Sequence, residues 1–247
     1  NSSSGVLTFA STPNYESPAD DGTNNEYIVI VTVTDSGGNT DTQTITVTVT
    51  DVNEFTPVIT SNSGGSTASI SFAENNTAAV TTVTSTDGDG TSTASYSISG
   101  GIDAADFSIN SSSGVLTFAS TPNYESADDD GTNNEYIVIV QVSDGSNTDT
   151  QTITVTVTDV NEVPTDISLS STSVNENESS GTTVGSLSST DVDAGDSHIY
   201  TWAIGTGDAD NDSFNIIGSS LVTKDVFNYE VKNSYSIRIR TTDSGGL

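Results

Sequence analysis

The sequence predicts an all-β protein built from tandem Greek-key β-sandwiches. Three observations support this fold class. Alternating polar and apolar residues recur along the 247-residue chain, no segment has an apolar stripe at the helical period, and a long stretch is repeated at domain-sized spacing. Clusters of Gly, Asn, Asp and Ser separate the alternating segments, as turns do in all-β proteins.

The alternation is clearest in two copies of one strand. Thr44–Thr50 alternates Thr with Ile or Val, and Thr152–Thr158 repeats the same seven residues. Such a strand has one buried and one solvated face, and β-branched side chains pack well on it. A second, more buried strand is expected at Tyr27–Thr34, Tyr136–Ser143 and Tyr235–Thr242. Shorter strands are expected at Ser69–Phe72, Val80–Ser85, Ser95–Ser99, Val115–Phe118, Ile199–Ala203 and Leu221–Thr223.

The repeat sets the expected domain organisation. Asn1–Ser17 is identical to Asn110–Ser126, and the two copies are 109 positions apart, which is the length of a whole domain. We therefore expect three parts: residues 1–54 as the final part of a repeat, 55–161 as a complete repeat, and 162–247 as a repeat lacking its last strand. Both ends fall inside repeats, so we expect a segment of a longer protein, with neighbouring repeats as partners.

The composition excludes several classes of function. The chain has 34 acidic and 4 basic residues, for a net charge of −30. Nucleic-acid binding requires basic side chains, and anionic membrane surfaces would repel this chain. No signal peptide or transmembrane segment is recognisable, so no membrane insertion is expected. The absence of Cys, together with abundant Ser, Thr, Asn, Asp and Gly, favours the outside of a bacterial cell.

Acidic motifs recur in the same order in successive repeats. Clusters of carboxylate and amide oxygens are the ligands that hard cations prefer, above all calcium. The motifs are an early Glu (Glu74, Glu176), Asp-x-Asp (Asp87-Gly88-Asp89, Asp191-Val192-Asp193), Asn-Tyr-Glu (Asn14-Tyr15-Glu16, Asn123-Tyr124-Glu125, Asn228-Tyr229-Glu230), a late Asp (Asp35, Asp144, Asp243), and two hinges, Asp51-Val52-Asn53-Glu54 and Asp159-Val160-Asn161-Glu162.

This ordered set resembles a cadherin repeat over essentially the whole chain. In that family an early Glu, Asp-Arg-Glu, a hinge of Asp-x-Asn-Asp-x-x-Pro, Asp-x-Asp and a late Asp occur in the same order. The resemblance implies an immunoglobulin-like sandwich of the cadherin type, with Ca²⁺ bound in the linkers between successive domains. Two departures, Asn for the Asp of Asp-Arg-Glu and Glu for the second hinge Asp, lead us to expect weak to moderate affinity.

Carried over to this chain, the resemblance implies two sets of calcium ligands, each drawn from two neighbouring repeats and the hinge between them. Without metal, the six carboxylates of the second set would repel one another. The first set is Asn14, Glu16, Asn53, Glu54, Asp87, Asp89 and Asp144. The second set is Glu74, Asn123, Glu125, Asn161, Glu162, Asp191, Asp193 and Asp243.

The favoured function is a calcium-rigidified extracellular spacer or adhesion repeat of a large surface protein. Two alternatives stay open: a homophilic adhesion module, and a carbohydrate-binding repeat, which should expose a row of aromatic residues beyond the Tyr-Glu motif. Tyr15, Tyr124 and Tyr229 are expected to pack beside the hinge, with stacking on sugars as the alternative role. An enzyme is not expected, because no nucleophile–base pair or nucleotide-binding loop occurs. His198, the sole histidine, is interpreted as a strand residue, and Trp202 as a core residue.

Overall fold

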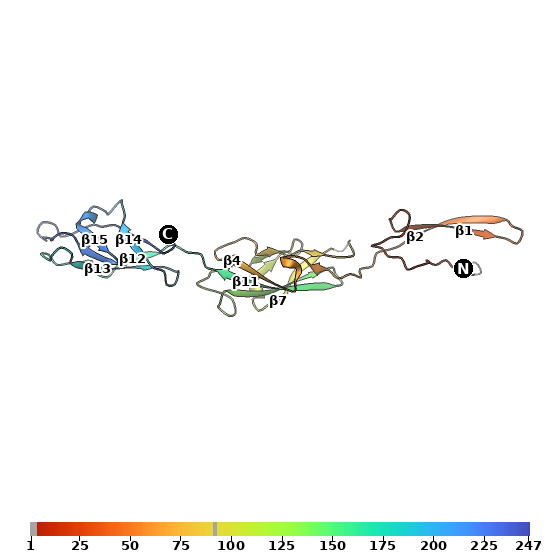
Figure 1. Cartoon of the computed structure of the whole chain (residues 1–247), viewed down its shortest axis with the longest axis horizontal. Helices are drawn as coiled ribbons and strands as arrows, with labels where there is room; N and C mark the ends of the chain where they lie inside the picture. Colours follow the sequence, from red (N-terminus) through yellow and green to blue (C-terminus); the bar gives the residue numbers. More distant parts are fainter. Residues whose placement is uncertain (1–3, 91–92) are drawn as a thin grey trace. The chain divides into compact units, whose positions relative to one another are not determined.

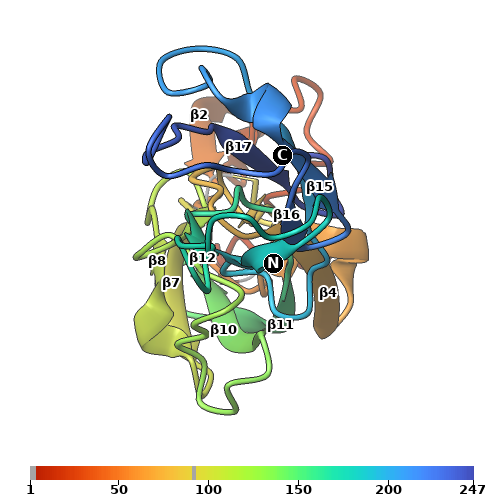
Figure 2. The same cartoon turned by 90° about the vertical axis from the view of Figure 1, so that its left-hand side faces the viewer.

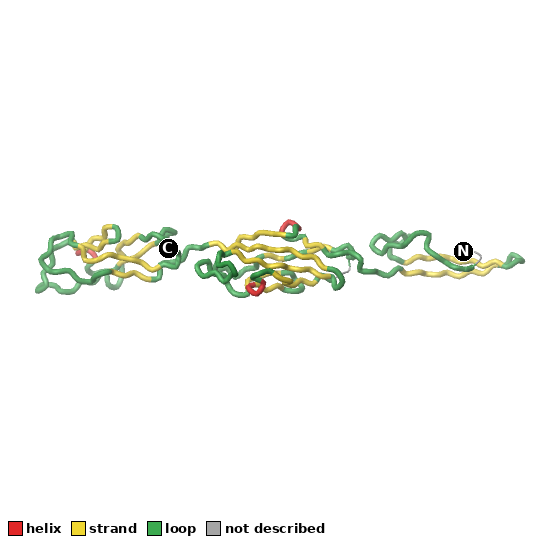
Figure 3. The backbone as a smooth tube through the Cα atoms, turned by 90° about the horizontal axis from the view of Figure 1, so that it is seen from below, coloured by secondary structure: helices red, strands yellow, loops and turns green. Residues whose placement is uncertain are grey.

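The computed structural model describes residues 4–90 and 93–247, so the first three residues of the repeated N-terminal stretch lie outside it. The regular elements of the described chain are almost all strands, with helical segments confined to short turns (Figure 3), as the sequence predicts. The helical elements are three 3₁₀ turns: η1 (Asn62–Gly64), η2 (Ala104–Asp106) and η3 (Asn211–Ser213). Two compact units are present: Asn1–Phe72 with Asn76–Pro122 and Asp128–Val157, and Ala73–Asn75 with Asn123–Ala127 and Thr158–Leu247.

The first unit begins with a hairpin of β1 (Glu26–Thr34) and β2 (Thr40–Thr48) (Figure 1). The two strands pair antiparallel from Glu26 opposite Thr48 to Thr34 opposite Thr40. Many apolar side chains of β1 are open to solvent, with Ile28 70% and Ile30 66% exposed. Among the described residues, this two-stranded sheet has no further strand.

The first unit also contains a sandwich. One sheet has the strand order β4-β11-β10-β7, and a second has the order β5-β9-β8. Strands β3 and β6 form a separate short antiparallel pair. The bounds are β3 (Val58–Ile59), β4 (Thr67–Ala73), β5 (Thr81–Thr82), β6 (Ser85–Thr86), β7 (Ser95–Gly100), β8 (Phe107–Ile109), β9 (Val115–Phe118), β10 (Glu135–Ser143) and β11 (Thr148–Thr158).

Strand β11 closes the core of this sandwich. Its alternate residues Ile153, Val155 and Val157 are at most 1% exposed, and they pack in one cluster with the buried residues of β10 and the facing sheet. Hydrogen bonds on its other edge join Thr152 to Ser66 and Glu74 to Thr158, so β11 runs parallel to β4. The alternation that predicted this strand therefore also places its apolar residues on the face that packs in the core.

The second unit contains a four-stranded sheet and a two-stranded sheet. The four-stranded sheet has the order β12-β13-β16-β15, and β14 pairs with β17. Strands β12, β15, β16 and β17 of this unit are labelled in Figure 2. Val184, Phe214 and Leu221 form the buried cluster, and Trp202 packs against it as a half-buried residue. The bounds are β12 (Asp166–Leu169), β13 (Thr183–Thr190), β14 (Ile199–Trp202), β15 (Phe214–Ile217), β16 (Ser220–Thr223) and β17 (Ile239–Thr242).

Two strand predictions need correction. The strand expected at Tyr235–Thr242 begins only at Ile239, because β17 pairs with β14 alone and the preceding residues have no partner strand in the described chain. The strand expected at Val80–Ser85 is divided between β5 and β6, which pair with different strands. Strands β3, β8, β12, β13 and β15 were not predicted, since they are short or lack regular alternation.

Gly114 allows a matched test of backbone strain. It has φ +70°, and a Cβ there would collide with the main-chain oxygen of Val83. Gly5 occupies the same place in the repeated sequence with φ +69°, but nothing lies within 4 Å of its Cβ position. Both replacements by Ala carry left-handed strain, whereas only Gly114→Ala adds a steric clash.

We predict that Gly114→Ala lowers the local free energy of unfolding by at least about 2 kcal/mol, and Gly5→Ala by less than about 1 kcal/mol. Native-state hydrogen exchange of the amides in β10 and in β1, respectively, measures the two effects. Equal losses at both positions would contradict the steric explanation.

Candidate metal centres

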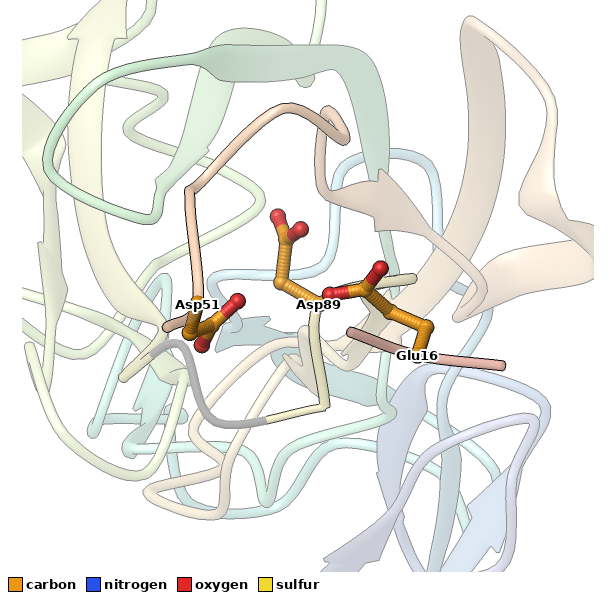
Figure 4. Close-up of side chains that lie close together, drawn as sticks. All are labelled: Glu16, Asp51 and Asp89. Carbon is orange, nitrogen blue, oxygen red and sulfur yellow. The ribbon is translucent and has the colours of Figure 1, made fainter. Parts of the chain in front are cut away.

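Three carboxylates from three separate segments converge at the first hinge. Glu16 comes from the Asn-Tyr-Glu motif, Asp51 opens the hinge, and Asp89 ends the Asp-Gly-Asp motif (Figure 4). Each offers one oxygen, and these oxygens all lie within 4.8 Å of one another. Asp89 is only 4% exposed, so this group of negative charges is partly removed from water.

Asp89 also belongs to a second group, with Asp87 and Asp144, whose oxygens again lie within 4.8 Å of one another. The main-chain N–H groups of Glu54 and Phe55 donate to the Asp89 carboxylate at 3.4 and 3.1 Å. With its nitrogen turned toward them, the Asn53 amide donates to both Asp89 and Asp144 at 3.1 Å. The hinge is thus held directly against the Asp-Gly-Asp motif.

The Asn of each Asn-Tyr-Glu motif shapes the turn that presents the Glu. Asn14 Oδ1 accepts the main-chain N–H groups of Glu16 at 2.8 Å and Ser17 at 3.1 Å. Asn123 Oδ1 likewise accepts the N–H of Ser126 at 2.7 Å. Asn and Asp side chains commonly stabilise turns in this way.

Glu74 anchors the second hinge. Its side chain is 2% exposed, and Oε2 accepts the N–H of Tyr124 at 2.8 Å while Oε1 accepts the N–H of Val160 at 2.9 Å. One carboxylate therefore links the Asn-Tyr-Glu turn to the hinge. The neighbouring Asn75 donates to Glu162 Oε1 at 2.6 Å, which fixes a second hinge residue.

Three groups of carboxylates surround this hinge, and successive groups share a member. Within each group the contributing oxygens lie within 4.8 Å of one another. Asp193 belongs to two of the groups, and one of its oxygens accepts the N–H of Glu162 at 2.8 Å. The groups are Glu74 with Glu125 and Glu162, Glu125 with Asp159 and Asp193, and Asp191 with Asp193 and Asp196.

Asn161 and Asp243 meet beside these groups. Asn161 Nδ2 donates to Asp243 Oδ2 at 3.2 Å, and Asp243 Oδ1 accepts the N–H groups of Gly246 and Leu247 at 2.6 and 2.9 Å. The hydrogen bond from the Leu247 main chain, together with those from Asn161 and Gly246, lowers the pKa of Asp243. His198 Nε2 lies 3.0 Å from Asp191 Oδ2, so the histidine contacts the edge of the acidic cluster.

Several hinge carboxyl groups are electrostatically strained. Burial, followed by repulsion from Glu16, Asp89 and Asp51, raises the pKa of Glu54. Burial and neighbouring carboxylates also raise the pKa values of Glu125, Asp159 and Glu162. Desolvation and like charges both favour the neutral form of an acid, so these sites accumulate negative charge without enough compensation from the protein.

The residues at both hinges fit a calcium ion. Buried side-chain oxygens without a hydrogen-bond donor are costly, and a cation would satisfy them. Such oxygens are Glu16 Oε1 and Oε2, Asp87 Oδ2, Glu162 Oε2, Asp193 Oδ1 and Asp196 Oδ2. Calcium accepts six to eight oxygen ligands in flexible geometry, as a mixed set of Asp, Glu, Asn and main-chain carbonyl groups can provide.

Sequence reasoning omitted three acidic residues from the ligand sets. Asp51 and Asp159 join equivalent groups at the two hinges. The sequence could have identified both as ligands, because each is the first residue of a hinge and the cadherin hinge motif also begins with Asp. Asp196 joins Asp191 and Asp193 without a counterpart in the other motifs, so only the fold of its loop reveals it.

The family model for the cadherin domain matches residues 68–158 and 170–247, so the chain belongs to the cadherin family. The family match and the similar solved structures confirm the predicted β-sandwich fold. Cadherin domains are extracellular adhesion-type repeats rather than enzymes, which confirms the predicted non-enzymatic class. They generally bind Ca²⁺. No helix in the described part of the chain has the length and apolar character needed to span a bilayer.

The chain is similar to protocadherin extracellular structures. Protocadherin GammaB4 is 25% identical with a TM-score of 0.55, over 92% of this chain and 36% of that one, so our chain spans about a third of its length. Human Protocadherin-24 EC1-2 is 24% identical with a TM-score of 0.59, over 77% and 88% of the two chains. No curated protein matches this chain. The expected bacterial origin is not borne out by these comparisons.

We predict that the calcium-free chain becomes more stable as pH falls from 7 toward about 5. The folded-state pKa values of Glu54, Glu125 and Glu162 are raised above the ordinary value of 4.5. Their contribution to stability is fully present below the ordinary value and is lost as pH rises through the raised folded value. Thermal melts in EDTA at several pH values measure this dependence.

The double variant Glu125→Gln/Glu162→Gln should flatten this rise in melting temperature. Asp144 and Asp243 do not interfere, because their pKa values are lowered from 3.8 and their stabilising effect is lost only below that value. An unchanged pH dependence in the double variant would contradict the electrostatic interpretation.

Proposed function

We propose that this chain is a run of calcium-stiffened cadherin repeats that serves as an extracellular spacer or adhesion segment of a longer surface protein. One observation carries the proposal. Glu16, Asp51 and Asp89 form a group at the first hinge, and Glu125, Asp159 and Asp193, which occupy equivalent motif positions, form the same group at the second. A metal site that belongs to the repeat itself would recur in this way at each hinge.

Each group draws its members from different places in the repeat. The Glu belongs to the repeat before the hinge, the first Asp to the hinge itself, and the second Asp to the Asp-x-Asp motif after the hinge. Bound calcium would supply the positive charge that turns mutual repulsion into shared attraction. The hinge would then lose conformational freedom when the ion binds, and regain it when the ion is removed.

The remaining candidate residues have supporting roles in this proposal. Asn14 and Asn123 shape the turns that present Glu16 and Glu125. The amide of Asn53 adjoins the carboxylate groups, and Asn161 bonds to Asp243. We propose domain boundaries after Glu54 and near Glu162, where these contacts tie each hinge to the Asp-x-Asp motif that follows it.

We predict that the chain binds calcium and that removing the central hinge carboxylates weakens binding. Asp51→Asn/Asp159→Asn should reduce affinity by at least about tenfold, because ligand loss costs at least as much as loss of a supporting contact. Calorimetric titration with calcium measures this change. Asp21→Asn, an exposed loop substitution, removes a carboxylate outside the metal-ligating groups and serves as the control.

A stiffening role also requires a structural response to the ion. Calcium at about 100 times its dissociation constant should stabilise the chain by about 2.7 kcal/mol at a single site. Scattering in calcium and in EDTA reports whether the hinge gains freedom on chelation. Unchanged scattering and melting curves, or equal calcium affinity in the hinge variant and the control, would rule out the proposed function.

A further inference from the structure

Asp-Gly pairs are concentrated at the first hinge. All members of one group of converging carboxylates are followed by glycine: Asp87, Asp89 and Asp144. Their counterparts at the second hinge are followed instead by Val, Ala and Ser: Asp191, Asp193 and Asp243. The two hinges therefore carry the same acids but differ in the residue that comes after each acid, and this residue governs the chemical stability of an aspartate.

An aspartate followed by glycine rearranges without an enzyme or a cofactor. The main-chain nitrogen of the glycine forms a bond to the side-chain carboxyl carbon of the aspartate, and the hydrogen of that nitrogen leaves with the carboxyl hydroxyl group as water. The resulting cyclic imide then takes up water at one of its carbonyl carbons. Addition at the side-chain carbonyl restores aspartate, whereas addition at the main-chain carbonyl breaks the original peptide bond and gives isoaspartate, in which the chain runs through the former side chain.

The packing of the first hinge explains why the residue after Asp87 is glycine. A Cβ on Gly88 would lie 2.5 Å from Cγ of the Phe55 ring. At the second hinge Val163 takes the place of Phe55, and Val192 takes the place of Gly88. Glycine has no Cβ to obstruct the approach of its nitrogen to the carboxyl group, whereas a β-branched valine crowds that nitrogen and restricts the local backbone. The aromatic residue of the first hinge thus keeps the reactive Asp-Gly pair in place.

Hydrogen bonds restrain Asp87 less than the other acids of its group. Asp89 is 4% exposed, and its carboxylate accepts two main-chain N–H groups from the hinge. Asp144 Oδ1 accepts two main-chain N–H groups at 2.6 Å. Asp87 Oδ1 accepts a single N–H, that of Asp89 at 3.1 Å, and its buried Oδ2 has no donor among the described residues. A bond from an aspartate to the second amide along the chain curls the side chain toward the intervening amide, which here belongs to Gly88.

We propose that Asp87 is a site of spontaneous isoaspartate formation in the folded protein, and that its counterpart Asp191 is not. The reaction needs no partner other than water, which is released when the imide closes and taken up when it opens. It does not depend on calcium or on the proposed function of the hinge. The difference between the two sites follows from the residue after each aspartate, Gly88 in one case and Val192 in the other.

Isoaspartate at position 87 would alter the first hinge alone. The rearrangement adds one methylene group to the main chain immediately before Gly88 and so displaces Asp89. The Asp89 carboxylate accepts the N–H groups of Glu54 and Phe55 at 3.4 and 3.1 Å, and the first hinge would lose this attachment as the protein ages. The equivalent bond at the second hinge, from the Glu162 N–H to Asp193 at 2.8 Å, would persist.

Ageing of the 247-residue chain in EDTA and oxygen-18 water, at physiological pH and temperature, tests the proposal. Opening of the imide incorporates one labelled oxygen, and fragmentation by mass spectrometry places the label and the isoaspartate at a residue. The chymotryptic peptides 73–96 and 188–200 contain the Asp-x-Asp motifs of the two hinges. Asp87 should accumulate label and isoaspartate with time, while Asp191 stays unlabelled. Asp21-Gly22, in an exposed loop, should also become labelled and serves as the reference.

Two variants separate this chemistry from damage to the fold. Asp87→Glu keeps the carboxylate but requires a larger ring that closes more slowly, and Phe55→Val/Gly88→Val reproduces the residues of the second hinge. Neither variant should accumulate label at position 87. The amide hydrogens of Glu54 and Phe55 should exchange faster in the aged than in the fresh wild-type chain, and equally fast in aged and fresh samples of each variant.

Three results would overturn the proposal. The first is an Asp87 that stays unlabelled, whether or not Asp21 becomes labelled. The second is label at Asp191 equal to that at Asp87, and the third is label at Asp87 that persists in Phe55→Val/Gly88→Val. Labelled Asp87 without faster exchange of the Glu54 and Phe55 amides would overturn the predicted loss of the hinge attachment.

Discussion

Repulsion between carboxylates at the hinges is the constraint on which the candidate sites depend. At each hinge, acids from the preceding repeat, the hinge and the Asp-x-Asp motif lie within 4.8 Å of one another, although the chain has only four basic residues. The protein offsets part of this repulsion with main-chain N–H groups, which hold Glu74 and Asp89 in place. Other oxygens, including both of Glu16, lack a donor. A divalent cation is the simplest counterpart to such an arrangement.

The hinge acids are of two kinds, which differ in the direction of their pKa shifts. Asp144 and Asp243 accept several N–H groups, and their pKa values are lowered. Glu125, Asp159 and Glu162 face other carboxylates, and their pKa values are raised. In the proposed function, acids of the first kind would order the hinge without an ion, whereas acids of the second kind would favour binding of a cation. A spacer that responds to calcium needs both properties.

The identical segments 40–50 and 148–158 show how the environment decides the state of a strand. Both copies form strands, because the alternation of Thr with Ile or Val suits a pleated sheet in either place. Only the second copy has neighbours on both edges and a facing sheet, so only there are its apolar residues buried.

The β-sandwich class, the strand at Thr152–Thr158 and most members of the acidic groups were predictable from the sequence, because period-two alternation and repeated motifs are local signals. The sequence could not determine that Tyr235–Arg238 stays outside a strand, since this depends on a partner distant in the chain. Nor could it separate Asp196, which joins the second hinge, from the many acids that remain in solvated loops. Tertiary structure decided these points, because strand pairing and the distance between charges are set by which segments the fold brings together.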